Sequence, residues 1–262
     1  MLRALMTAAS GMKSQQLQLD TIANNIANVN TEGFKRSRLS FRSLLYQTLR
    51  EPGAPTSSTL VQPTGLQIGS GAEVSAATKD FKQGELLQTD GQLDLAIQGE
   101  GFFRLRLPTG DFRYTRNGSF RLDANGVIVS SEGYPLEGAP SIPVDAISII
   151  VGEDGTIATM NREDQLPQQL GQIQLYRFAN PTGLKAQGRT MYTESGSTGA
   201  AQAQTPGQSG AGSVLQGYTE RSNVQTVDEL VSLIVAQRNY EVNSRAIKAS
   251  DEMLQQTNQL IR

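Results

Sequence analysis

The chain has 262 residues, a formal net charge of −2, and no cysteine, histidine or tryptophan. Zinc and iron–sulfur sites with thiolate or imidazole ligands are therefore excluded, as are disulfides and nucleophile systems that use histidine. No window approaches twenty apolar residues, and the amino-terminal MLRALMTAASGMKS lacks the apolar core of a secretory signal. We expect a protein that is soluble or part of an assembly, and that is cytosolic or exported without oxidative folding.

The first thirty residues carry apolar side chains at heptad spacing. One track is spaced by seven, and a second track lies three positions later. Their apolar members are Leu5, Met12, Leu19 and Ile26, and then Ala8, Ile22 and Val29. This pattern predicts a long amphipathic helix, about 45 Å over thirty residues. Gly33 is placed to end that helix in a left-handed conformation.

The carboxyl-terminal residues repeat the heptad pattern. Thr226 and Glu229 form a capping-box pair ahead of an apolar run, which predicts the start of a second long helix. The apolar track consists of Leu233, Tyr240, Ile247, Leu254 and Ile261. Its companion track is small or polar and consists of Ala236, Asn243, Ser250 and Thr257.

Two interpretations of these terminal helices, residues 1–33 and 225–262, remain open. They could form a pair that closes an ordinary domain, or a coiled coil that packs against further copies of the chain. The second is favoured because both helices carry polar positions in their seams, which makes a seam selective about its neighbours. Asn24, Asn25, Asn28 and Asn30 would then hydrogen-bond neighbouring helices.

The middle of the chain predicts an antiparallel β domain over residues 93–195. Short alternating segments such as Phe103–Leu107 and Ile173–Tyr176 are separated by turn signals, among them Asn125-Gly126 and Asp154-Gly155. A small barrel or sandwich is expected. Residues 34–92 and 196–224 are predicted to be connecting or extended segments, and a Pro/Gly-rich arm covers 51–71. The predicted fold class is α+β, with paired terminal helices and an inserted β domain.

No residue pattern in the chain points to catalysis, a cofactor or a metal. The Gly99–Arg104 stretch lacks the third glycine of a dinucleotide loop, and Asp123–Gly126 is better read as a hairpin turn than as a calcium loop. Asp94, Asp111 and Asp123 could form a carboxylate pair, but each precedes or starts a turn. We expect no enzyme, no nucleic acid and no small-molecule substrate.

The charge of the first fifty residues is the one local asymmetry. Basic residues outnumber the two acidic ones, and a solvated face is expected. The basic residues are Arg3, Lys13, Lys35, Arg36, Arg38, Arg42 and Arg50.

Three motifs, in order, resemble the family of flagellar rod and hook proteins. They are ANNIANVNTEGFKRSR, QGEGFFRLRLPTGDFRYTRNGSFRLDANGVIVSSEGYPL and GYTERSNVQTVDELVSLIVAQRNYEVNSRAIKASDEMLQ. The first carries the family signature at Ala23, Asn24, Asn25, Ala27, Asn28, Thr31, Gly33, Phe34 and Lys35. The length and the stretch LLYQTLREPGAPTSSTLVQPTGLQIGSG resemble the subunit of the distal rod. A proximal rod or hook subunit is the alternative.

The resemblance implies a structural subunit that polymerises helically into a rigid hollow tube, with the terminal helices around the export channel and the β domain outside. It implies export by the flagellar type III apparatus and a basal-body location from periplasm to outer membrane. The implied partners are further copies, proximal rod and hook subunits, the ring bushing and the export apparatus. The self-assembly residues would be the apolar heptad positions Leu5, Met12, Leu19, Ile22, Ile26, Val29, Leu233, Tyr240, Ile247 and Leu254.

Two further segments take roles from the resemblance. Phe41 and Leu45 look like the Phe-x-x-x-apolar element that docks on the export gate. The Pro/Gly-rich arm is expected to lie against neighbouring subunits and to stiffen the rod, because prolines keep it out of a regular ladder. Its candidate residues are Pro52, Pro55, Leu60, Val61, Pro63, Leu66 and Ile68.

Overall fold

The computed structural model describes residues 2–53, 64–143, 145–161, 167–208 and 210–260. The chain divides into two compact units. Unit one contains residues 1–26, 37–78 and 226–262, and unit two contains 27–36 and 79–225. Unit two extends on both sides of the β domain predicted for 93–195. Four arm residues (Pro55, Leu60, Val61 and Pro63) and Ile261 lie outside the described residues.

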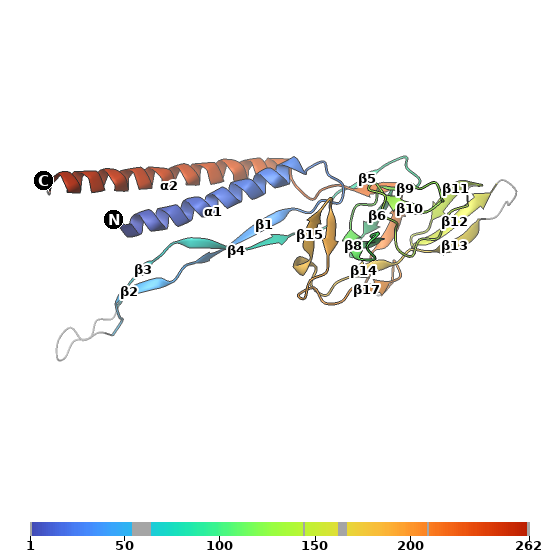
Figure 1. The fold of residues 1–262 in the computed structure, drawn as a ribbon, viewed down its shortest axis with the longest axis horizontal. Coiled ribbons are helices and arrows are strands. Elements are labelled where there is room, and N and C mark those ends of the chain that lie inside the picture. Colours follow the sequence, from blue (N-terminus) through green and yellow to red (C-terminus); the bar gives the residue numbers. More distant parts are fainter. Residues whose placement is uncertain (1, 54–63, 144, 162–166, 209, 261–262) are drawn as a thin grey trace. The chain divides into compact units, whose positions relative to one another are not determined.

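Unit one contains two long helices, α1 (Leu2–Ala27) and α2 (Thr226–Leu260), which lie side by side (Figure 1). They approach closely where a Cβ added to Gly11 would lie 3.0 Å from Asn243 Nδ2. The coiled-coil geometry of the pair stays a prediction. Acidic residues Asp228 and Glu229 in the first turn of α2 suit the positive end of its dipole.

Four strands complete unit one. β1 (Ser37–Ser43) pairs with β4 (Ala72–Lys79), and β2 (Tyr46–Arg50) pairs antiparallel with β3 (Leu66–Gly69). The expectation that the arm avoids a regular ladder was therefore wrong for Leu66 and Ile68, which lie in β3. Every residue of β2 and β3 is exposed, and the prolines fall outside both strands.

The helix boundary at the signature also differs from the prediction. Helix α1 ends at Ala27, and turns cover residues 28–33. Gly33 has a φ of +68°, so its left-handed conformation was predicted correctly, but it does not cap the helix. Its role is steric, because a Cβ there would lie 2.4 Å from the backbone nitrogen of Asn117.

Unit two is built from short antiparallel strands in sheets of two to four, where a single barrel or sandwich was expected. The four-stranded sheet has the order β15 (Lys185–Gly188), β16 (Met191–Thr193), β8 (Phe112–Thr115) and β7 (Phe103–Arg106). The three-stranded sheet has the order β11 (Ala146–Val151), β12 (Thr156–Asn161) and β13 (Gln168–Gln172). The two-stranded pairs are β9 (Phe120–Leu122) with β10 (Ile128–Ser130), β14 (Leu175–Arg177) with β17 (Gln202–Gln204), β6 (Leu95–Gln98) with β18 (Ser213–Gln216), and β5 (Leu86–Gln88) with β19 (Tyr218–Glu220). A 3₁₀ turn covers Pro181–Gly183.

The pairing of β18 and β19 corrects the prediction of a connecting segment at 196–224. These strands pair with β6 and β5, far away in the sequence, so local periodicity carries little signal for them. The predicted strand around Ile173–Phe178 also divides, because β13 ends at Gln172 and β14 begins at Leu175.

Unit two has two hydrophobic clusters. The larger includes Leu95, Ile97, Phe103, Leu105 and Ile157, all with at most 1% of their surface exposed. Each such side chain contributes roughly 1.5–3 kcal/mol when fully buried. The smaller cluster is largely aromatic and consists of Phe102, Tyr114, Tyr176, Phe178, Leu184 and Tyr192. Phe102, Phe103, Tyr114 and Phe120 are therefore core residues, whereas Phe112 is exposed. Within the described residues, neither helix is long and apolar enough to span a membrane.

Candidate functional site: a buried ion cluster and exposed helix faces

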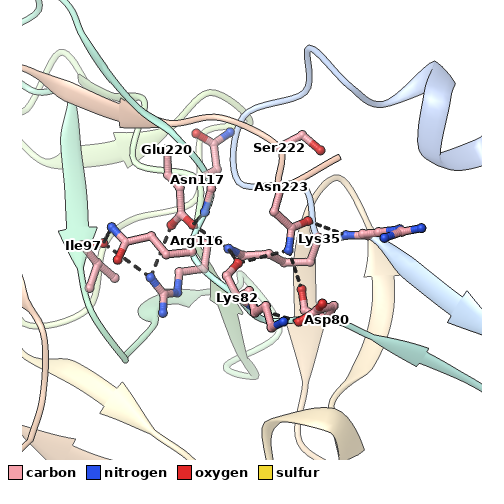
Figure 2. Close-up of polar contacts among 12 residues, drawn as sticks. Lys35, Asp80, Lys82, Ile97, Arg116, Asn117, Glu220, Ser222 and Asn223 are labelled. Atoms are coloured by element: carbon pink, nitrogen blue, oxygen red, sulfur yellow. Dashed lines mark hydrogen bonds and ion pairs between the residues drawn. The ribbon is translucent and has the colours of Figure 1, made fainter. Parts of the chain in front are cut away.

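A buried ion cluster centres on Glu220 in β19 (Figure 2). Its Oε1 lies 2.5 Å from Lys35 Nζ, and its Oε2 lies 3.3 Å from Arg116 Nη1. The side chains of Lys35 and Glu220 are fully buried, and that of Arg116 is 4% exposed. The expected solvated basic face is therefore wrong for Lys35, whose charge is neutralised inside unit two.

Backbone carbonyls accept further hydrogen bonds from the two cations of this cluster. Lys35 Nζ donates to the carbonyl of Lys82 at 2.7 Å, and Arg116 Nη2 donates to the carbonyl of Gly99 at 2.7 Å. Burial lowers the pKa of Lys35 and of Arg116, and the carboxylate of Glu220 opposes both shifts. Two cations thus share one carboxylate, and the carbonyls supply further acceptors, while Arg116 Nε is buried without a hydrogen-bond partner.

Backbone and amide hydrogen bonds join three chain segments around this cluster. Gly33 N–H donates to the backbone carbonyl of Glu220 at 2.8 Å, and Arg36 N–H donates to Asn223 Oδ1 at 2.8 Å. Asn223 Nδ2 in turn donates to the carbonyl of Asp80 at 2.9 Å. Figure 2 shows Asn223 between Asp80 and the chain at Lys35. The end of the signature is therefore held against residues 80–84 and 220–223.

The signature asparagines serve this chain's own fold, where contacts with neighbouring helices were expected. Asn25 is 1% exposed and exchanges two 2.9 Å hydrogen bonds with the backbone of Ser37, at the start of β1. Its amide also lies 3.4 Å from Glu229 Oε2 in α2. Asn28 accepts a hydrogen bond from Thr31 within the turn, and Asn30 accepts one from Arg221. The expected hydrogen bonds to neighbouring helices stay a prediction for these three residues.

The remaining signature residues are placed as follows. Ala23, Asn24 and Ala27 lie on the exposed side of α1. Phe34 is half-buried beneath the ammonium of Lys79, which lies 4.4 Å from its ring centroid.

The predicted self-assembly residues are mostly half-buried, and all lie in unit one except Val29, which lies in a turn of unit two. Ile22 is 2% exposed, Tyr240 is 40% exposed, and the other members are intermediate. Sequence reasoning missed a more exposed stripe at i, i+3, i+4 and i+7 on α2, where 47–72% of each side chain is accessible. Its members are Val227, Leu230, Val231 and Ile234. The apolar run 230–235, interrupted only by Ser232, was the available signal, since the apolar residues of a one-sided helix recur every three to four positions.

The proposed export residues lie on the strand part of unit one. Phe41, in β1, is 45% exposed and lines a groove of about 320 Å³ with Gln18 of α1 and Val231 of α2. Leu45 lies between β1 and β2 and is 88% exposed.

The candidate carboxylates occupy turn positions. The backbone carbonyl of Asp123 accepts from the amide of Gly126 at 2.9 Å in the β9–β10 turn, and its carboxylate accepts from the amide of Ala124 at 2.7 Å. The carboxylate of Asp94 accepts from the hydroxyl of Thr89 at 2.7 Å. No group of three or more acidic, histidine or cysteine side chains that could hold a metal occurs among the described residues. The arrangement suits packing and assembly.

Three parts of the chain match families of flagellar axial proteins. Residues 5–35 match the flagella basal body rod protein family, residues 96–159 the flagellar hook protein FlgE/F/G D1 domain, and residues 215–260 the flagellar basal body rod FlgEFG protein C-terminal family. These matches cover α1 with the signature, the core strands, and α2. The chain therefore belongs to the family of flagellar rod and hook proteins.

Full-length relatives place it more narrowly. The flagellar basal-body rod protein FlgG of Caulobacter vibrioides is 45% identical over 99% of both chains. FlgG of Borreliella burgdorferi is 44% identical over all of both chains, and FlgG of Buchnera aphidicola subsp. Schizaphis graminum is 42% identical over 99% of this chain and all of its own. The chain belongs to the FlgG family and is a structural subunit of the flagellar distal rod, located in the basal body.

Proposed function

We propose that this subunit assembles helically, through its terminal helices, into a rigid hollow tube that encloses the export channel and transmits torque from motor to hook. The observation that carries this is the exposed apolar stripe on α2. A monomer rarely leaves contiguous apolar surface of this kind uncovered. Further copies of the chain, together with proximal rod and hook subunits, are the partners that would cover it.

Single substitutions on the stripe test the helix-mediated assembly. Ile234→Asp places a charge on a side chain that is 49% exposed, so the monomer should fold while polymerisation is lost. Gln237→Asp adds the same charge at an exposed polar position of the same helix and should polymerise normally. Sedimentation of polymer and electron microscopy of the pellet provide the measurement. Normal rods from Ile234→Asp would contradict the proposal.

The β2–β3 hairpin supports the proposed stiffening arm. An isolated two-stranded ribbon is at best marginally stable in water, and this one exposes Tyr46, Leu49, Leu66 and Ile68. Packing against neighbouring copies would cover these side chains and would oppose the sliding between subunits that bending requires. Deletion of residues 52–63 should give bent rods in electron micrographs. Replacement of the same residues by a glycine–serine segment of equal length tests whether the prolines are needed to keep the rod straight. Straight rods from the deletion would rule the arm out.

The export route and the finer location are part of the same proposal. We infer that Phe41 and Leu45 dock the unfolded chain on the flagellar type III export gate, and that the assembled rod crosses from periplasm to outer membrane within the ring bushing. Phe41→Ala should reduce secretion without changing cellular levels, while the neighbouring exposed Ser43→Ala should not. Unchanged secretion of Phe41→Ala would make Phe41 a structural residue only.

The location of the labelled protein along the flagellar axial structure distinguishes a distal rod subunit from a proximal rod or hook subunit. Labelled protein located between the rings and the hook agrees with a distal rod subunit. Label near the inner membrane or along the hook would favour the alternative.

A further inference from the structure

Unit two contains a cavity of about 440 Å³ that is lined in part by aromatic side chains. Phe81, Phe102 and Phe178 line it, with ring centroids 5.4 Å and 5.8 Å apart in edge-to-face contact. Pro181 and Thr182 also line it, and Thr182 is exposed. Cavities of this size with apolar walls and a few polar groups are typical binding sites.

The charges around this cavity are predominantly positive. Lys82 and Arg177 line it, and Arg116 lies in its wall. Arg177 is paired with Glu100 at 2.5 Å, and Glu220 neutralises part of the charge of Arg116 and Lys35. Four cations thus face three carboxylates in and behind the wall, because Asp80 also lies near Lys35 and accepts from the amide of Lys82 at 3.1 Å. The cavity therefore suits an apolar side chain that has a carboxylate beside it.

The same unit exposes such a side chain at Ile147. The ladder between β11 and β12 pairs Ala146 with Asn161 and then Ser148 with Met160, so Ile147 is the extra residue of a β-bulge. β11 is an edge strand, and Ile147 is 62% exposed. Bulges at sheet edges often redirect a side chain outward. Asp145, two residues earlier, is also exposed and carries the required negative charge.

We propose that Ile147 of one copy inserts into the aromatic cavity of a second copy, with the Asp145 carboxylate beside Lys82 and Arg177. This rests on the self-assembly proposed above and assigns it a specific contact between β units. The cavity and the bulge share no residue, so the contact is heterologous. A heterologous contact repeats from copy to copy and produces an open helical polymer when it does not close into a ring.

Two variants block the two halves of this contact separately. Thr182→Trp fills the cavity from its rim, and Ile147→Asp removes the inserted side chain. Thr109→Trp is the matched control for the first, because each threonine hydroxyl bonds a side chain two residues away, at 2.6 Å in Thr182 and 3.1 Å in Thr109. Leu122→Asp is the control for the second, since Leu122 is also an exposed strand residue of unit two. Circular dichroism melting checks that all four fold.

The mixture of the two blocked variants gives the decisive result. Each variant alone should lose most of its sedimentable polymer, while both controls assemble. Mixed together, the intact cavity of Ile147→Asp can bind the intact Ile147 of Thr182→Trp once, so analytical ultracentrifugation should give one-to-one complexes that do not grow. Normal polymer from either variant, or a mixture that stays monomeric, overturns the contact. Failure of the wild-type chain to polymerise would instead overturn self-assembly itself.

Discussion

Removing the negative charge of Glu220 should strongly destabilise unit two. Glu220→Gln keeps the shape of the side chain and one acceptor oxygen, but it removes the negative charge that pairs with the buried cations Lys35 and Arg116. Breaking a buried pair by removing one partner costs about 3–5 kcal/mol, because the desolvation cost of the remaining charge is no longer offset.

The chain contains a matched exposed pair as the control. Glu100 and Arg177 also lie 2.5 Å apart, but the Glu100 side chain is 74% exposed. Water screens this pair, so Glu100→Gln should cost less than about 1 kcal/mol. The difference between the two substitutions therefore reflects the burial of Glu220 together with its second cationic partner, Arg116, because the shorter ion-pair distance is the same in both.

Urea unfolding followed by near-ultraviolet circular dichroism makes the measurement. The chain has no tryptophan, so the signal comes largely from buried tyrosines of unit two such as Tyr114, Tyr176 and Tyr192. With an m-value of about 1–3 kcal/mol/M, a loss of about 3 kcal/mol lowers the urea midpoint by about 1–3 M. Equal and small shifts for Glu220→Gln and Glu100→Gln would refute the reasoning that burial makes the Glu220 cluster essential to the fold.

Two further predictions concern the same region. Gly33→Ala should lower the free energy of unfolding by more than about 1–2 kcal/mol, because the new side chain would meet both a left-handed φ and a clash with the backbone of Asn117. A melting temperature equal to that of the wild type would contradict this prediction. Burial, and next the charge of Glu220, raise the pKa of Tyr192 above its ordinary 10.0, so the unfolded chain loses this proton first and stability falls as pH rises above 10. Tyr192→Phe should therefore make the alkaline loss of stability shallower, by up to about 1.4 kcal/mol per pH unit in urea titrations, and an unchanged slope would argue against it.

The sequence predicted elements with strong local signals and missed those that depend on distant partners. Heptad spacing and the capping box at Thr226 located both helices, and the Asn125-Gly126 turn located the β9–β10 hairpin. β18 and β19 were taken as connecting segments because their partners, β6 and β5, lie more than a hundred residues earlier.

The buried cluster was beyond local reasoning for the same reason. Lys35 sits in a basic run that looks solvated, and only the fold places Glu220 against it across 185 residues of sequence. The exposed stripe on α2 was visible in the sequence as an apolar run. Helical periodicity alone did not show which apolar residues of α2 are buried within unit one and which are exposed. The signature asparagines were ambiguous in the same way, because an amide group can bond a neighbouring helix or its own backbone equally well.

The position of the Glu220 cluster along the chain has a mechanical consequence. Lys35 follows Ala27, the last residue of α1, and Glu220 precedes Thr226, the first residue of α2. The ion pair therefore joins the unit-two segment that follows one helix to the unit-two segment that precedes the other. The adjacent pairing of β19 with β5, and the hydrogen bonds of Asn223 to Arg36 and Asp80, act in parallel with that contact. The buried pair resists separation of these two segments, because opening it would leave charges without water or a partner.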